Sequence, residues 1–298
     1  MEPATGSTVP RRTLGIVLLR ERIRSGKTQA EAAAAIGQSI QSVRRIEQGT
    51  VGTPTGKVAN LCDLYGTAGP TREALMKLAG ETKSTAQRWW HSYGDVVPAW
   101  FELYVALETT AVRERCFDPL LVNGLLQEPS YTAVAIPALD PALSDEDVAA
   151  RAELRRDRQQ LLTRSFPGPL RLEAIITEPV LMIDMPETVM RAQLWHLLKA
   201  TELPHVQVRI LPLSAGVHRA AVTGAFTLLD FPAAHGNTLP STVYSETQTG
   251  AIYLDTPDEV ATYEQIWAAL QDQALDQQQS IELISHRMKE INDREAQR

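Results

Sequence analysis

Apolar residues near the start of the chain recur every three or four positions, which is the period of a helix buried on one face. The pattern begins at Leu14 and stops at Gly26, and it predicts a first helix. Thr28 followed by Glu31 has the spacing of a capping box, in which each side chain bonds a free backbone N–H at a helix start. A second helix is therefore expected from Thr28, and Gly37 supplies the tight turn that ends it.

Three further helices complete a predicted five-helix bundle. The third begins at the capping residue Ser39 and ends before Gly49, and two more are expected at 57–65 and 71–81. The length favours two domains, with one long domain as the alternative. The predicted divisions are a flexible arm over 1–13, a helical domain over 14–81 and a second domain over 82–298.

The rest of the chain mixes helical and strand patterns without the regular strand and helix rhythm of a doubly wound sheet. The expected fold class is therefore a mainly α N-terminal domain followed by an α+β domain. Its predicted helices lie at 98–113, 129–138, 144–164, 187–201, 257–274 and 276–292. Its predicted strands lie at 170–176, 206–211, 225–230, 242–245 and 251–254.

The third predicted helix has two faces of different chemistry. Val43 and Ile46 form an apolar stripe that can hold the bundle together, and the opposite side chains remain for another surface. A helix in the DNA major groove presents such outward side chains to base edges. For the two arginines of this face, a solvated basic surface is the alternative. The candidate DNA-binding residues of this helix are Ser39, Ile40, Gln41, Ser42, Arg44 and Arg45.

The segment from Lys27 to Gly49 resembles the XRE family, the phage-repressor type of helix-turn-helix. The matching features are its Thr-Gln start, Ala33, Gly37, Val43, Ile46, Glu47 and Gly49. The resemblance implies a transcription regulator whose third helix reads DNA.

The same resemblance implies a role for individual residues. Ser39, Ile40, Gln41 and Arg45 take the positions that approach bases, with Arg44 beside them. Gln41 would pair with adenine, Arg45 with guanine, and Ile40 would pack on a thymine methyl group. Gln29 matches the position that grips a phosphate and supports the recognition helix. Glu47 is expected to pair with an arginine such as Arg22.

Charge is distributed unevenly along the chain, whose net charge is −7. Residues 1–86 carry 12 Lys and Arg against 7 Asp and Glu, whereas the remaining residues carry 17 against 29. A basic head on an acidic body fits DNA binding by the head alone, because positive charge is needed only at the surface that contacts phosphate.

The body from Trp89 onward is similar to the domain that follows this helix-turn-helix in actinobacterial regulators of the WhiJ-like and antitoxin-like type. The resembling segments include Val122 to Gln127, Leu170 to Glu178 and Tyr244 to Glu246. The resemblance implies a small partner protein encoded nearby, and a small-molecule effector is equally open. The aromatic residues that could line an apolar ligand pocket, with ordinary core packing as the alternative, are Trp89, Trp90, Trp100, Phe101 and Tyr104.

Catalytic and cofactor motifs are not found in the sequence. None of the six histidines has metal-ligand spacing with a carboxylate base, and there is no P-loop, nucleophile elbow or paired-cysteine motif. Glu108, Glu178 and Glu246 are expected to be structural hydrogen-bond partners. We therefore expect no enzyme activity, no cofactor and no metal site.

Localisation is expected to be cytoplasmic. No apolar run approaches the roughly 20 residues that span a bilayer, and the first 13 residues lack the apolar core of a secretory signal. Cys62 and Cys116 lie far apart in the sequence, which fits free thiols in a reducing compartment.

The functional hypothesis is a homodimeric, sequence-specific DNA-binding regulator. One recognition helix reads only a few base pairs, so specificity in a genome needs two half-sites roughly 34 Å apart. Two copies of the protein would bind these half-sites as an inverted-repeat operator. The alternative is an antitoxin-like interaction module that binds a small neighbouring protein and autoregulates through DNA. The helices within Pro257 to Asn292 are candidates either for the dimer surface or for the core, through Trp267, Leu270, Leu275, Ile281, Ile284 and Met288.

Overall fold

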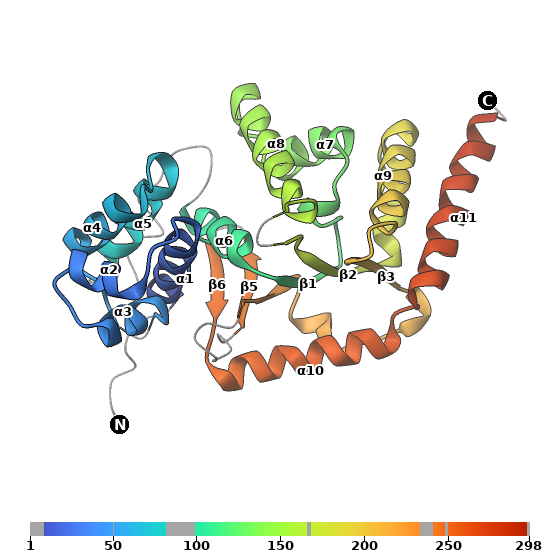
Figure 1. The fold of residues 1–298 in the computed structure, drawn as a ribbon. Coiled ribbons are helices and arrows are strands. Elements are labelled where there is room, and N and C mark those ends of the chain that lie inside the picture. The colour runs from blue at the N-terminus through green and yellow to red at the C-terminus, as the bar shows by residue number, and fades with distance from the viewer. Residues whose placement is uncertain are drawn as a thin grey trace. The chain divides into compact units, whose positions relative to one another are not determined.

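The computed structural model describes residues 9–49, 51–81, 99–165, 168–232, 241–247 and 250–296. The chain divides into two compact units. The first comprises Met1–Thr110 with Phe231–Leu239, and the second comprises Ala111–Asp230 with Pro240–Arg298. The first unit is helical in its described part and the second is an α+β domain, which confirms the fold class expected from the sequence (Figure 1).

The described part of the first unit is built from helices alone. α1 packs against α3, α4, α5 and α6, and α2 packs against α3. α1 begins earlier than expected, so residues 9–13 of the predicted arm are helical. The core contains Leu14, Leu18, Leu61 and Leu75, each exposed by at most 1%. The helices are α1 (Val9–Arg24), α2 (Gln29–Ala35), α3 (Ile40–Glu47), α4 (Thr55–Tyr65), α5 (Gly69–Glu81) and α6 (Ala99–Thr110).

The second unit is organised around a mixed six-stranded sheet in the order β3-β2-β1-β4-β5-β6. β1 pairs with β2 and β2 with β3 in parallel, whereas β4, β5 and β6 are added antiparallel. The five strands expected from the sequence are confirmed within a few residues. The strands are β1 (Arg113–Asp118), β2 (Arg171–Thr177), β3 (Val206–Leu211), β4 (Phe226–Asp230), β5 (Thr242–Thr247) and β6 (Gly250–Leu254).

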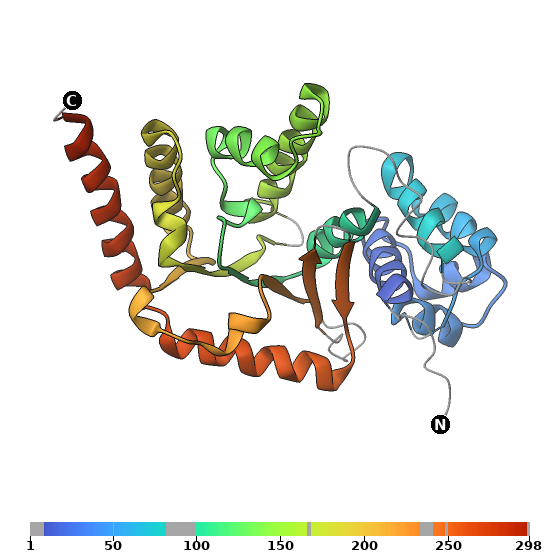
Figure 2. The same cartoon turned by 180° about the vertical axis from the view of Figure 1, so that it is seen from behind.

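Helices cover both faces of this sheet. α7 (Pro129–Leu139), α8 (Asp145–Gln159) and α9 (Glu187–Ala200) lie on one face, and α10 (Pro257–Gln273) runs along the other (Figures 1 and 2). α11 (Gln277–Ala296) packs against α9 and β3.

An apolar core lies between α10 and the sheet. Phe117, Ile175 and Leu228 of the strands join Trp267 and Leu270 of α10 in one buried cluster. Ile284 of α11 is also fully buried. Of the two roles expected for these α10 and α11 residues, a dimer surface or the core, they therefore have the second: they pack in the core of one copy of the chain.

The central strand β1 was not expected from the sequence, which predicted a helix through Arg113 and no strand between that helix and residue 170. Its residues Arg-Glu-Arg-Cys-Phe-Asp look too polar for a buried strand. Arg115 is only 4% exposed, and a buried guanidinium is stable only when paired. The charge of β1 is matched by carboxylates on neighbouring elements, and a single sequence window does not contain this information.

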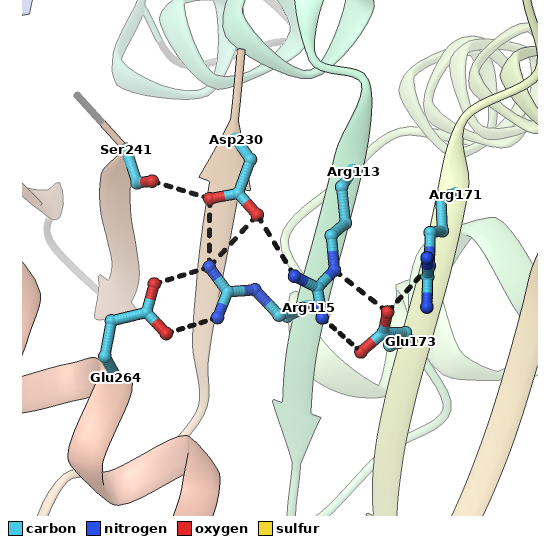
Figure 3. A network of polar contacts seen from close by, with 7 residues as sticks. All are labelled: Arg113, Arg115, Arg171, Glu173, Asp230, Ser241 and Glu264. Atoms are coloured by element: carbon cyan, nitrogen blue, oxygen red, sulfur yellow. Dashed lines mark hydrogen bonds and ion pairs between the residues drawn. The ribbon is translucent and has the colours of Figure 1, made fainter. Parts of the chain in front are cut away.

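A network of ion pairs provides this matching (Figure 3). Nη2 of Arg115 lies 2.9 Å from Oδ1 of Asp230 and 2.6 Å from Oε1 of Glu264, which belongs to α10. Arg113 donates to both carboxylate oxygens of Glu173, at 2.9 and 2.8 Å. We call this set the α10-face network, and it comprises Arg113, Arg115, Arg171, Glu173, Asp230, Ser241 and Glu264.

Candidate DNA-binding interface

The α2-turn-α3 motif is fixed by local hydrogen bonds. The predicted capping box is present: the Glu31 backbone N–H donates to Thr28 Oγ1 at 3.2 Å and the Thr28 N–H to Glu31 Oε2 at 2.8 Å. Ser39 caps α3, its hydroxyl accepting from the Ser42 N–H at 3.1 Å. Gly37 has φ +59°, a conformation that glycine adopts without strain. The sequence therefore encodes both helix starts and the turn between them.

Packing against α1 sets the position of α3. Val43 and Ile46 are 1% and 6% exposed, as the apolar stripe predicted. Gly15 of α1 lies against the end of α3, where an added Cβ would come within 2.4 Å of the Ile46 carbonyl oxygen and 2.8 Å of that of Glu47. Only glycine permits this approach. The sequence reasoning missed Gly15, because a glycine inside a helical pattern does not reveal what passes beside it.

A buried ion pair also holds the end of α3. Glu47 is 1% exposed and binds Arg22 of α1 through Arg22 Nε and, at 3.2 Å, Nη2, which confirms the expected partner. Gln29 Nε2 donates to Glu47 Oε2 at 2.8 Å, and Arg22 Nη1 donates to the Lys27 carbonyl at 3.0 Å. Gln29 therefore contacts the end of α3.

The outward face of α3 holds the remaining candidates. Ile40 is 48% exposed although it is a large apolar residue, and Ser39, Gln41, Arg44 and Arg45 are exposed as well. Ser42 is half-buried, and its hydroxyl lies 3.0 Å from that of Ser39. The two arginines give this face a positive charge. An exposed face that combines amide, hydroxyl, guanidinium and apolar groups matches what the edges of base pairs offer.

The predicted aromatic pocket is described only in part. Trp89 and Trp90 lie outside the described residues, as does the side chain of Trp100. Phe101 and Tyr104 stand on α6 with ring centroids 5.6 Å apart, and Tyr104 is 3% exposed. The pocket stays a prediction.

The described part of the chain lacks two kinds of feature. No helix there is both long and apolar enough to cross a membrane. Within the same residues, no group of three or more His, Cys, Asp or Glu side chains is arranged to hold a metal ion.

Comparison with protein families agrees with this geometry. The family described as helix-turn-helix domain matches residues 13–75, so the N-terminal unit contains a domain of the class that binds DNA in transcription regulators. The family described as domain of unknown function (DUF5753) matches residues 101–286, more than half of the chain, and the chain belongs to this family. No curated protein and no solved structure matches the chain.

Proposed function

We propose that the protein is a cytoplasmic, homodimeric, sequence-specific transcription regulator of the XRE type that binds an inverted-repeat operator. The observation that carries this proposal is the division of α3 into a buried stripe of Val43 and Ile46 and an exposed face with Gln41, Arg44 and Arg45. The positive charge of Arg44 and Arg45 on this exposed face is what contact with DNA phosphates and base edges requires.

Each residue of this interface has a proposed role. Arg45 donates two hydrogen bonds to guanine, Gln41 pairs with adenine, and Ile40 contacts a thymine methyl group. Ser39, Ser42 and Arg44 flank these contacts. Gln29 grips a phosphate at the start of α2, and its bond to Glu47 connects that contact to the position of α3.

The second unit is proposed to regulate the head by sensing a small molecule or a small partner protein. Dimerisation follows from mechanism, because one recognition helix reads too few base pairs for specificity in a genome. If binding a neighbouring small protein is the main activity, the protein is instead an antitoxin-like module of the WhiJ-like, actinobacterial group that autoregulates through DNA.

The test is to sequence the genomic fragments that the purified protein retains at moderate salt. The Arg44→Ala/Arg45→Ala double variant removes the proposed base-reading charges. Arg72→Ala serves as a matched control, since it removes an arginine from α5 of the same unit. An inverted repeat retained by wild type and Arg72→Ala, but not by the double variant, supports the proposal. No enrichment by wild type would contradict it and favour the antitoxin-like alternative.

Single substitutions separate reading of bases from support of the helix. Arg45→Ala is expected to weaken binding to the cognate site by about 1 to 3 kcal/mol and to relax preference at one base position. Gln29→Ala is expected to weaken cognate and random sequences more evenly, because it removes a phosphate contact and a support. Titrations on both kinds of DNA measure the difference, and equal losses for both variants would contradict the role of Arg45.

A further inference from the structure

A row of arginines lies along one face of α8. Arg151, Arg155 and Arg158 are spaced by four and three residues, which places them on the same side of a helix. Arg158 is 7% exposed, and its Nη1 lies 3.1 Å from where a Cβ on Gly124 would stand. This face of α8 therefore points into the protein, toward the turn at 124–127.

Hydrogen bonds hold α8 in this orientation. Gln159 Nε2 donates to the carbonyl oxygens of Gly124 and Gln127, at 3.1 and 2.7 Å. The Val122 N–H donates to the hydroxyl of Tyr131 at 3.4 Å. The segment from Val122 to Gln127, which the sequence analysis singled out without a role, thus forms part of the surroundings of the arginine row.

Two carboxylates of the sheet lie close enough to the arginine row to interact with it electrostatically. Asp118 ends β1 and Glu246 lies on β5. Phe117, next to Asp118, and Val243, three residues before Glu246, belong to the core beneath α10. Because side chains alternate along a strand, Asp118 and Glu246 lie on the opposite face, where α8 is. We call this set the α8-face cluster, and it comprises Asp118, Tyr131, Arg151, Arg155, Arg158, Tyr244 and Glu246.

Burial shifts the pKa values of the charged groups in this cluster toward their neutral forms. Burial raises the pKa of Asp118 to about 6 and raises that of Glu246, although Arg158 lowers both. Both groups nevertheless keep part of their surface in contact with solvent. Burial, followed by the charge of Arg158, lowers the pKa of Arg155 to about 10. Arg151 is also paired outside the cluster, because its Nη1 lies 3.5 Å from Oδ2 of Asp140. Arg155 is therefore the candidate for contact with a ligand.

One donor in the cluster has no acceptor. Nη1 of Arg155 is buried and has no hydrogen-bond partner among the described residues. Leaving a buried charged donor without an acceptor is unfavourable, and a planar guanidinium matches a carboxylate or phosphate through two parallel hydrogen bonds. An anion at this point would supply the missing acceptor.

We propose that the α8-face cluster is the binding site for a small organic anion, a carboxylate or a phosphate, with Arg155 as its main ligand. Tyr244 donates to Glu246 Oε2 at 2.9 Å and keeps that carboxylate turned to its own strand. This inference deepens the proposed sensing role of the second unit by naming its site and the class of its ligand.

The experiment measures thermal unfolding of the full chain with sodium phosphate or sodium succinate, each against sodium chloride at equal ionic strength. Arg155→Gln removes the proposed ligand. Arg156→Gln is the matched control, because Arg156 is the next residue of the same helix and is exposed. Arg155→Lys keeps the charge but loses the guanidinium fork. Calorimetric titration of the anion that acts gives the affinities, and circular dichroism verifies that each variant is folded.

We expect one of the two anions to raise the unfolding temperature of wild type and Arg156→Gln alike. Arg155→Gln is expected to bind it about tenfold more weakly, with Arg155→Lys in between. The anion that raises the unfolding temperature identifies the ligand as a carboxylate or as a phosphate. No specific shift with either anion, or an equal shift in Arg155→Gln, overturns the proposal.

Failure of this site and failure of the proposed function are distinguishable. Anion binding is measured without DNA, whereas the retention of genomic fragments is measured without added anion. The head can bind phosphate as well, and a shift that disappears in Arg44→Ala/Arg45→Ala but persists in Arg155→Gln would assign the anion to the head and contradict the α8-face site.

Discussion

Two groups of arginine and carboxylate side chains lie on opposite faces of the same sheet, and they differ in how completely their members are paired. In the α10-face network, Arg115 binds Asp230 and Glu264, and Arg113 binds Glu173 (Figure 3). Nε of Arg115 is buried without a hydrogen-bond partner among the described residues, but both of its Nη groups donate to carboxylates. In the α8-face cluster, it is the terminal Nη1 of Arg155 that has no acceptor among the described residues. Arginine and carboxylate side chains are therefore paired differently on the two faces of the sheet.

The pKa values of the carboxylates report the same difference. Burial alone would raise the pKa of Glu173, but the hydrogen bonds and charge of Arg113 outweigh it and the pKa is lowered. Burial of Asp118 outweighs the effects of Cys116, Asn123 and Arg158, and its pKa is raised to about 6. A paired network stabilises the fold, whereas an incompletely paired cluster is suited to receive a charged ligand.

The largest expected effect comes from breaking the paired network. Arg115→Met would leave Asp230 and Glu264 without their shared partner, and removing one side of a buried ion pair costs about 3 to 5 kcal/mol. We expect a loss near the lower end of this range, because Glu264 is 40% exposed and solvent screens its charge. Urea unfolding followed by circular dichroism measures the loss.

Arg171→Met is the matched control within that network. Its side chain is 63% exposed, and an exposed ion pair contributes about 1 kcal/mol or less. Similar losses for Arg115→Met and Arg171→Met would mean that burial does not distinguish the members of the network.

The limits of sequence reasoning follow from this comparison. The head could be predicted because its signals are local: the capping box at Thr28 and Glu31 and the apolar stripe of α3 each lie within one helical turn or two. β1 could not, because Arg113 and Arg115 are neutralised by residues far along the chain. The arginine row of α8 is visible in the sequence, but only the fold places it opposite Asp118.

An intermediate effect is expected from the titration of Asp118, whose pKa rises from 3.8 to about 6 on folding. Between these pH values the unfolded chain has lost the proton and the folded chain keeps it, so the free energy of unfolding falls as pH rises. Asp118→Asn removes this titration. The free energy of unfolding of the variant, taken relative to that of wild type, should therefore rise by about 1 to 3 kcal/mol from about pH 4 to about pH 7.

The groups facing Asp118 are Cys116, Asn123, Arg158 and Tyr131, and these are unchanged in the variant. Urea unfolding at a series of pH values measures the difference between the two proteins. Glu153→Gln, an exposed position on α8, should show no such gain. A constant difference between wild type and Asp118→Asn across this window would show that Asp118 is paired like Glu173.

The smallest expected effect is the most direct test of the difference between the two faces. Arg155→Gln should change the free energy of unfolding by about 1 kcal/mol or less. The loss of its charge interaction with Glu246 is offset by the removal of a buried donor that has no acceptor among the described residues. Arg156→Gln should behave the same way in urea unfolding without added anion. A loss for Arg155→Gln close to that of Arg115→Met would mean that Arg155 holds the fold together, and the two faces of the sheet would then share one structural role.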